Sequence, residues 1–150
     1  MLRKIVSTTN DGTLTILRLA LGIVFFAHGA QKMLGWFGGY GFSGTMGYFT
    51  HQLGIPWVFG FLAILTEFLG GLGLIVGLLS RIPAFAIIVE MVAVVVMIHG
   101  RFGFFMNWSG TQGGEGYEYH VVLIAVSLVI LIRGSGSLSI DARLSSSPAL

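Results

Sequence analysis

Four long apolar segments constrain this chain more than any other feature. They cover residues 13–34, 57–79, 82–99 and 119–132, and a helix needs about 20 mostly apolar residues to cross a bilayer. Only 9% of the residues are charged, whereas about 25% are charged in soluble domains. A chain this short buries too little of its surface to hide so many apolar side chains from water. The sequence predicts an all-α integral membrane protein, a four-helix bundle in which residues 1–150 form one domain.

The connections between these segments differ in length and character. A tight turn, Ser80-Arg81-Ile82-Pro83, joins the second and third segments, and proline suits the first turn of a helix, so these two helices are predicted to be antiparallel neighbours. The connections 35–56 and 100–116 are long and rich in glycine and aromatic residues, which is typical of the membrane boundary. Residues 43–53, with mixed polarity, are predicted to form a short helix lying in the membrane interface.

The distribution of basic residues predicts the orientation. If the helices alternate, two cations (Lys32 and Arg101) lie on one side and the others lie opposite: Arg3, Lys4, Arg18, Arg81, Arg133 and Arg143. The positive-inside rule then places both termini of this multi-pass protein in the cytoplasm and the long loops outside. The basic residues form no stripe, so the lipid bilayer rather than nucleic acid is the predicted partner.

Several ionisable residues lie at membrane depth, where an Arg, Lys or Asp costs about 2.5–3.5 kcal/mol. On the first helix, a stripe from Arg18 to Lys32 lies on one face and His28 lies beside it. Glu67 occupies the middle of the second helix. These groups are predicted to face one another inside the bundle, with Arg18 and Lys32 as cationic partners of Glu67. The predicted pocket residues are Arg18, His28, Lys32, Glu67 and His99, and the secondary candidates are Glu90, Glu118 and His120.

Simpler explanations stay open for some of these residues. Arg18 and Lys32 could extend to the headgroups, and His99, Arg101, Glu118 and His120 could be interfacial. Gly73 and Gly77 have the spacing that lets helix backbones approach, either inside the bundle or in a homo-oligomer. The four histidines show no zinc-binding motif, so we predict no metal site, and haem is not favoured. Without cysteine, the chain cannot perform thiol–disulfide chemistry itself.

The order and spacing of several short motifs resemble the DoxX family over nearly the whole chain. In the first half they are Arg18-Leu19, Phe26-Ala27-His28-Gly29, Lys32, Gly41-Phe42 and Leu53-Gly54-Ile55-Pro56. In the second half they are Glu67, Gly70-Gly71, Gly77-Leu78, Arg81, Met91, His99, Gly116, Glu118-Tyr119, Gly134, Gly136, Ser139 and Asp141. Glu90 and His120 fall outside the shared pattern.

The resemblance implies a small four-helix protein of the bacterial cell (inner) membrane, in a family that carries an oxidoreductase label. The family is similar to the small subunit of an archaeal thiosulfate:quinone oxidoreductase, and some members belong to a complex with superoxide dismutase and a thiosulfate sulfurtransferase. Our leading hypothesis is a membrane component of a redox complex, with membrane or peripheral protein partners, that handles quinone or a small sulfur-containing reductant in an outward-opening pocket. The alternatives are a non-enzymatic scaffold or assembly partner and, less favoured, a small transporter. Which residue is catalytic, if any, stays open.

Overall fold

The computed structural model describes residues 2–146, and this part of the chain is helical with no strand. Three continuous helical segments are long and apolar enough to cross a membrane: Gly12–Leu34, Trp57–Val76 and Arg81–Phe102. The first is α2. The second consists of α4 (Trp57–Leu65), the π-turn η3 (Thr66–Gly70) and α5 (Gly71–Val76), and the third of α6 (Arg81–Val94), the π-turn η4 (Val95–His99) and the 3-10 turn η5 (Gly100–Phe102). The prediction of an all-helical membrane protein is therefore confirmed.

The fourth predicted span corresponds to α7, Glu118–Arg133, which has 16 residues. At 1.5 Å per residue it is about 24 Å long, somewhat shorter than the roughly 30 Å hydrocarbon core. The other elements are short: α1 (Leu2–Val6), η1 (Trp36–Gly38), α3 (Gly41–Gly47), the π-turn η2 (Tyr48–Gln52) and α8 (Ile140–Ser146). The predicted helix in the first loop exists as α3 and η2, and its place in a membrane interface stays a prediction.

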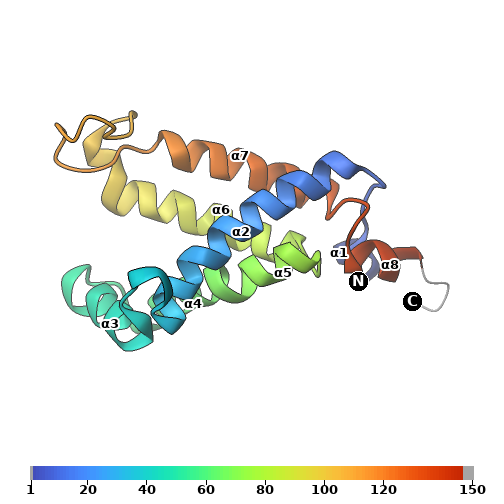
Figure 1. The fold of residues 1–150 in the computed structure, drawn as a ribbon, viewed down its shortest axis with the longest axis horizontal. Helices are drawn as coiled ribbons and strands as arrows, with labels where there is room; N and C mark the ends of the chain where they lie inside the picture. The colour runs from blue at the N-terminus through green and yellow to red at the C-terminus, as the bar shows by residue number, and fades with distance from the viewer. Residues whose placement is uncertain (1, 147–150) are drawn as a thin grey trace.

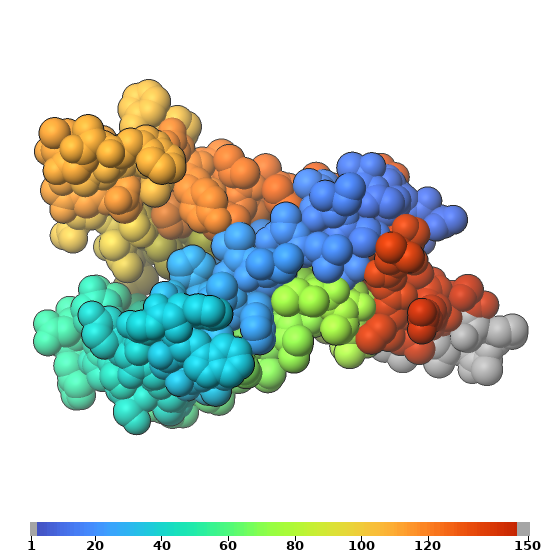
Figure 2. All heavy atoms as spheres, in the orientation of Figure 1, coloured from blue at the N-terminus to red at the C-terminus, as the bar shows by residue number. Residues whose placement is uncertain are grey.

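The long helices pack in two groups. α2 lies along η3 and α5, while α6 packs against α7, and contacts of α2 with α7 and of η3 with α6 join the groups (Figure 1). Both chain ends lie at one end of the molecule and both long loops at the other (Figure 1). Figure 2 shows that the two loop-bearing ends stand apart, with an open notch between them. Below, the end near the termini is called the inner end and the loop end the outer end, after the predicted orientation.

Glycines allow α2 to cross the second helical segment at backbone contact. A Cβ atom added to Gly29 would lie 2.3 Å from the backbone nitrogen of Phe68, and one added to Gly71 would lie 2.4 Å from that of Phe26. The predicted stripe on the first helix faces this contact, since Arg18, Phe25 and Gly29 are buried. The apolar core beside it contains Leu21, Phe25, Leu74, Ala84, Ile87, Met91, Leu123 and Ile130.

Gly73 and Gly77 were predicted to let two helix backbones approach each other, but Gly77 has a different role in the structure. Gly77 has φ of 70° and ends α5 in the left-handed conformation, which glycine adopts at little cost. An added Cβ there would lie 2.4 Å from the Cβ atom of Ser139. Gly77 therefore terminates a helix and makes room for the C-terminal segment, instead of packing one long helix on another.

We expect Gly29→Ala to destabilise the protein, because the new methyl group meets backbone atoms that cannot rotate away. Overpacking typically costs about 1–3 kcal/mol, and a backbone clash belongs at the upper end. The matched control is Gly47→Ala, where an added Cβ has no atom within 4 Å. Thermal unfolding in detergent, followed by size-exclusion chromatography, measures both variants. Equal unfolding midpoints for the two variants would contradict the tight crossing.

Candidate functional site

Arg18 is 1% exposed, and backbone carbonyl groups surround its guanidinium. Its Nε donates to the carbonyl oxygen of Ser135 at 2.9 Å, and Nη2 donates to that of Leu138 at 2.7 Å. Nη1 donates to the carbonyls of Leu74 and Ile75, the latter at 2.7 Å. The last carbonyls of a helix lack partners within the helix, and a cation there also complements the helix dipole. Arg18 thus caps α5 and holds the segment that follows α7.

Asp141 completes this inner network. Its carboxylate accepts hydrogen bonds from the backbone nitrogens of Leu79 at 2.8 Å and Ser80 at 3.1 Å, and from the hydroxyl of Ser135. Its own backbone nitrogen donates to the carbonyl of Gly77 at 2.9 Å. The C-terminal segment therefore folds back over the end of α5. We did not predict Asp141 as a site residue; the available signal was its regular spacing after Gly134, Gly136 and Ser139.

Arg18 lies far from the other predicted pocket residues. It is fourteen residues from Lys32 on the same helix, which corresponds to about 21 Å. Its hydrogen bonds go to carbonyls at the inner end, so it does not pair with Glu67. The structure therefore divides the predicted pocket into an inner network around Arg18 and a separate outer site around Lys32.

The outer site is built on a partly buried ion pair. Nζ of Lys32 lies 2.5 Å from Oε2 of Glu67, and the two side chains are 25% and 8% exposed. Glu67 occupies the π-turn η3, a local widening of the helix that is frequent at functional sites. The close crossing at Gly29 brings α2 against this turn. The prediction that Lys32 is a cationic partner of Glu67 is confirmed.

Glu90 on α6 joins this pair. Its carboxyl group interacts with Glu67 and with the charge of Lys32. Its Oε2 atom is shielded from solvent and has no hydrogen-bond partner among the described residues. Two acids and one base from three helical segments therefore meet at the junction of α2, η3 and α6. This group, Lys32, Glu67 and Glu90, is called the outer triad below.

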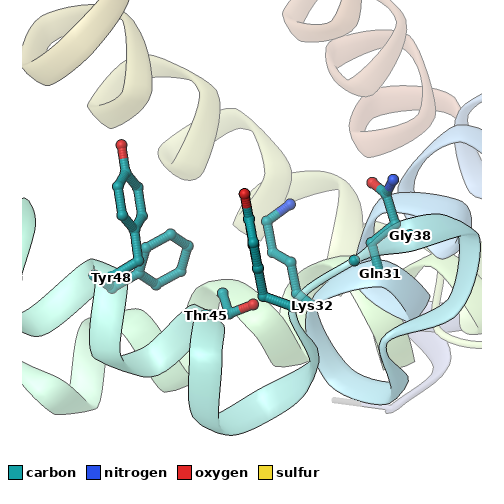
Figure 3. Close-up of a pocket in the computed structure, with 8 residues that line it drawn as sticks. Gln31, Lys32, Gly38, Thr45 and Tyr48 are labelled. Atoms are coloured by element: carbon teal, nitrogen blue, oxygen red, sulfur yellow. The ribbon is translucent and has the colours of Figure 1, made fainter.

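A surface pocket of about 270 Å³ borders the outer triad. Lys32 and Gln31 contribute from α2, and the rest of its wall comes from the first loop (Figure 3). Figure 3 shows the side chains of Lys32 and Tyr48 projecting to the same side of the loop. The pocket offers one cation together with hydroxyl, amide and aromatic groups. Its lining residues are Gln31, Lys32, Gly38, Gly39, Tyr40, Thr45, Tyr48 and Phe49.

The predicted histidines lie elsewhere. His28 is exposed on α2, so it does not line an interior pocket. The rings of His99 and His120 contact each other, with centroids 4.5 Å apart, and Nδ1 of His99 lies 2.7 Å from the carbonyl oxygen of Glu115. Glu118 accepts a hydrogen bond from the backbone nitrogen of Met106 at 3.0 Å. These contacts fasten the third connection to α6 and α7, and none of these residues lines the pocket near Lys32.

The described residues contain no group of three or more His, Asp or Glu side chains placed to hold a metal ion. The side chains at the outer site offer an ammonium group, two carboxyl groups and the phenol groups of Tyr40 and Tyr48.

We expect Arg18→Gln to destabilise the inner end, because Gln cannot serve four carbonyl groups and leaves Asp141 without its nearby cation. Removing one partner of a buried charged network typically costs about 3–5 kcal/mol. Arg133→Gln removes an exposed cation and serves as the control, with a small expected effect. Unfolding midpoints in detergent compare the two. Equal stability of the two variants would show that the network is not needed for folding.

Comparison with known proteins shows the family to which this chain belongs. The DoxX family model matches residues 13–100, which include Arg18, Lys32, Glu67 and Glu90. The chain is also 26% identical over 130 residues to a protein of Bacillus subtilis (strain 168) named "Putative oxidoreductase CatD", covering 87% of this chain and 84% of the relative. No solved structure matches the chain. A match over more than half of its length shows that this helical membrane protein belongs to the DoxX family.

Proposed function

We propose that this protein is a membrane component of a redox complex that handles quinone or a small sulfur-containing reductant at the outer site. The observation that carries the proposal is the partly buried Lys32–Glu67 ion pair, at 2.5 Å, next to a pocket lined mainly by loop residues. Placing charged groups at membrane depth costs free energy, so residues of this kind usually stabilise the fold or take part in a function. The oxidoreductase name of the relative supports the same class.

The groups around the pocket suit such ligands. The ammonium group of Lys32 can donate hydrogen bonds to a quinone carbonyl or to an oxygen of a sulfur oxyanion. Aromatic side chains of Tyr40, Tyr48 and Phe49 offer flat apolar surface to a ring. Glu67, which is paired with the pocket residue Lys32, carries a carboxyl group of the kind that transfers protons in catalysis. Because the chain has no cysteine, a redox partner protein or the reductant itself would supply electrons.

A scaffold role is the second candidate, and the inner network favours it. Arg18 and Asp141 are committed to backbone groups that hold the fold, so this half of the molecule needs no ligand to explain its charges. Crosslinking in membranes followed by mass spectrometry distinguishes the candidates. A stable partner, together with loss of protein rather than loss of turnover in Glu67→Gln, would favour the scaffold. Flux measurements in proteoliposomes test the less favoured transporter.

We expect purified protein to carry quinone and to reduce it with thiosulfate when its redox partner is present. Both properties should be lost in Lys32→Gln and in the double variant Lys32→Gln/Glu67→Gln. The double variant removes both charges together, so no unpaired charge stays buried. Arg101→Gln, which removes an exposed cation outside the pocket, is the control and should retain both properties. Quinone is measured in solvent extracts, and turnover by the absorbance of the quinone.

The proposal would be refuted by three results together. The purified protein would carry no quinone, it would show no turnover, and a strain with Glu67→Gln would have an unaltered phenotype.

A further inference from the structure

We propose that Glu67 and Glu90 share one exchangeable proton and deliver it to an oxygen of the ligand held by Lys32. This inference rests on the proposed function and assigns a role to Glu90. The π-turn η3, which contains Glu67, packs against α6, which contains Glu90, and this packing brings the two carboxyl groups together. Lys32 is paired with Glu67, while the Oε2 atom of Glu90 is shielded from solvent and has no partner among the described residues.

The first argument is the balance of charge in the outer triad. One ammonium group can neutralise one carboxylate, and a second carboxylate in an apolar interior would be an uncompensated charge, which is strongly unfavourable. Neutrality is reached when the two carboxyl groups together hold one proton. Two acids that interact this closely behave as a pair, and the proton belongs to the pair rather than to either residue.

Lys32 is the described cation whose charge acts on Glu90. Arg101 lies eleven residues further along the same helical segment and stacks over the Phe102 ring at 4.6 Å. Arg18 is committed to carbonyls at the inner end, about 21 Å from Lys32 along α2. Arg81 begins α6 and donates to the carbonyls of Leu131, Ile132 and Ser7, and it lies nine residues, or about 13 Å, from Glu90. The middle of α7, residues 121–132, packs on α6 and contains no titratable side chain. Lys32 and Glu67 are therefore the charged groups that face Glu90.

The second argument is the path that the contacts provide. Glu90 adjoins Glu67, Glu67 adjoins Lys32, and Lys32 lines the pocket. When a bound quinone receives two electrons from the sulfur-containing reductant, each of its reduced oxygens forms an O–H bond. The O–H bond of the carboxyl pair breaks to supply one of the two protons, and a proton carried into the pocket from the solvent as hydronium supplies the other. A second solvent proton then restores the carboxyl pair, so two electrons from the reductant and two protons from the solvent together form the quinol.

The first test needs no ligand. Infrared spectra of full-length protein in detergent, recorded in H₂O and in D₂O, detect a protonated carboxyl group by its C=O band. We expect a band that wild type shows and that both Glu90→Gln and Glu67→Gln lose, because either change leaves one carboxylate balanced by Lys32. Glu118→Gln is the control, since Glu118 accepts a backbone hydrogen bond in the loop, and it should keep the band. Glu90→Asp retains an acid and tests the assignment if Glu90→Gln fails to fold.

The second test uses a short-chain naphthoquinone as the probe, reduced by an electrode in the infrared cell. In time-resolved spectra the carboxyl band of wild type should fall on reduction and then recover as the solvent returns the proton, whereas Glu90→Gln, which lacks the band, should show no such transient. Turnover in the reconstituted complex should fall roughly 100-fold in Glu90→Gln, in the range typical of losing a positioned proton donor, with KM little changed. Absence of the band in wild type, or a band that both Gln variants retain, would overturn the shared proton.

The two proposals fail in different ways. If the probe does not bind, the quinone form of the proposed function fails. If it binds and is reduced while the carboxyl band stays constant, the proposed function survives and the proton transfer is refuted.

Discussion

The protein depends on one constraint: a charged group placed among hydrocarbon must find its partners inside the protein. Arg18 meets this constraint with four backbone carbonyl groups from α5 and from the segment after α7. Asp141 meets it with two backbone nitrogens and a hydroxyl group. These bonds satisfy the end of α5, which would otherwise present bare carbonyls, and they determine where the C-terminal segment lies. At the inner end, the Nε, Nη1 and Nη2 atoms of Arg18 therefore all donate hydrogen bonds to backbone carbonyls.

The outer half follows the same constraint with a different result. Lys32 and Glu67 satisfy each other, but Glu90 adds a second acid without a second base, and its Oε2 atom has no partner. A site of this kind can accept or release a proton with little movement, whereas the saturated inner network cannot. The pocket lies beside the unsaturated half. The contrast between the two ends is the physical reason for assigning structure to the Arg18 network and chemistry to the outer triad.

Sequence reasoning predicted the long helices because apolar runs of spanning length have few other stable conformations. It also predicted the buried stripe from Arg18 to Lys32, because helical periodicity places residues three and four apart on one face. It failed where partners come from distant parts of the chain. Arg18 was expected near Glu67 because both are charged and deep, but its partners are backbone carbonyls at the end of α5 and in the segment after α7. His28 was expected inside and is exposed, since its position beside the stripe already turns it away from the contact with η3.

The sequence by itself determined that this chain is a helical membrane protein and that its few charged residues at membrane depth require polar partners inside the protein. Composition and the periodicity of apolar residues are local properties, and in lipid a spanning backbone must satisfy its own hydrogen bonds, which a helix does. Only the tertiary structure decided which charges meet. The crossing at Gly29 and the π-turn at Glu67 set the distance between Lys32 and its acid, and the packing of α6 brings Glu90 to the same point. Such distances depend on how helices from separate segments pack, and no local pattern of residues encodes them.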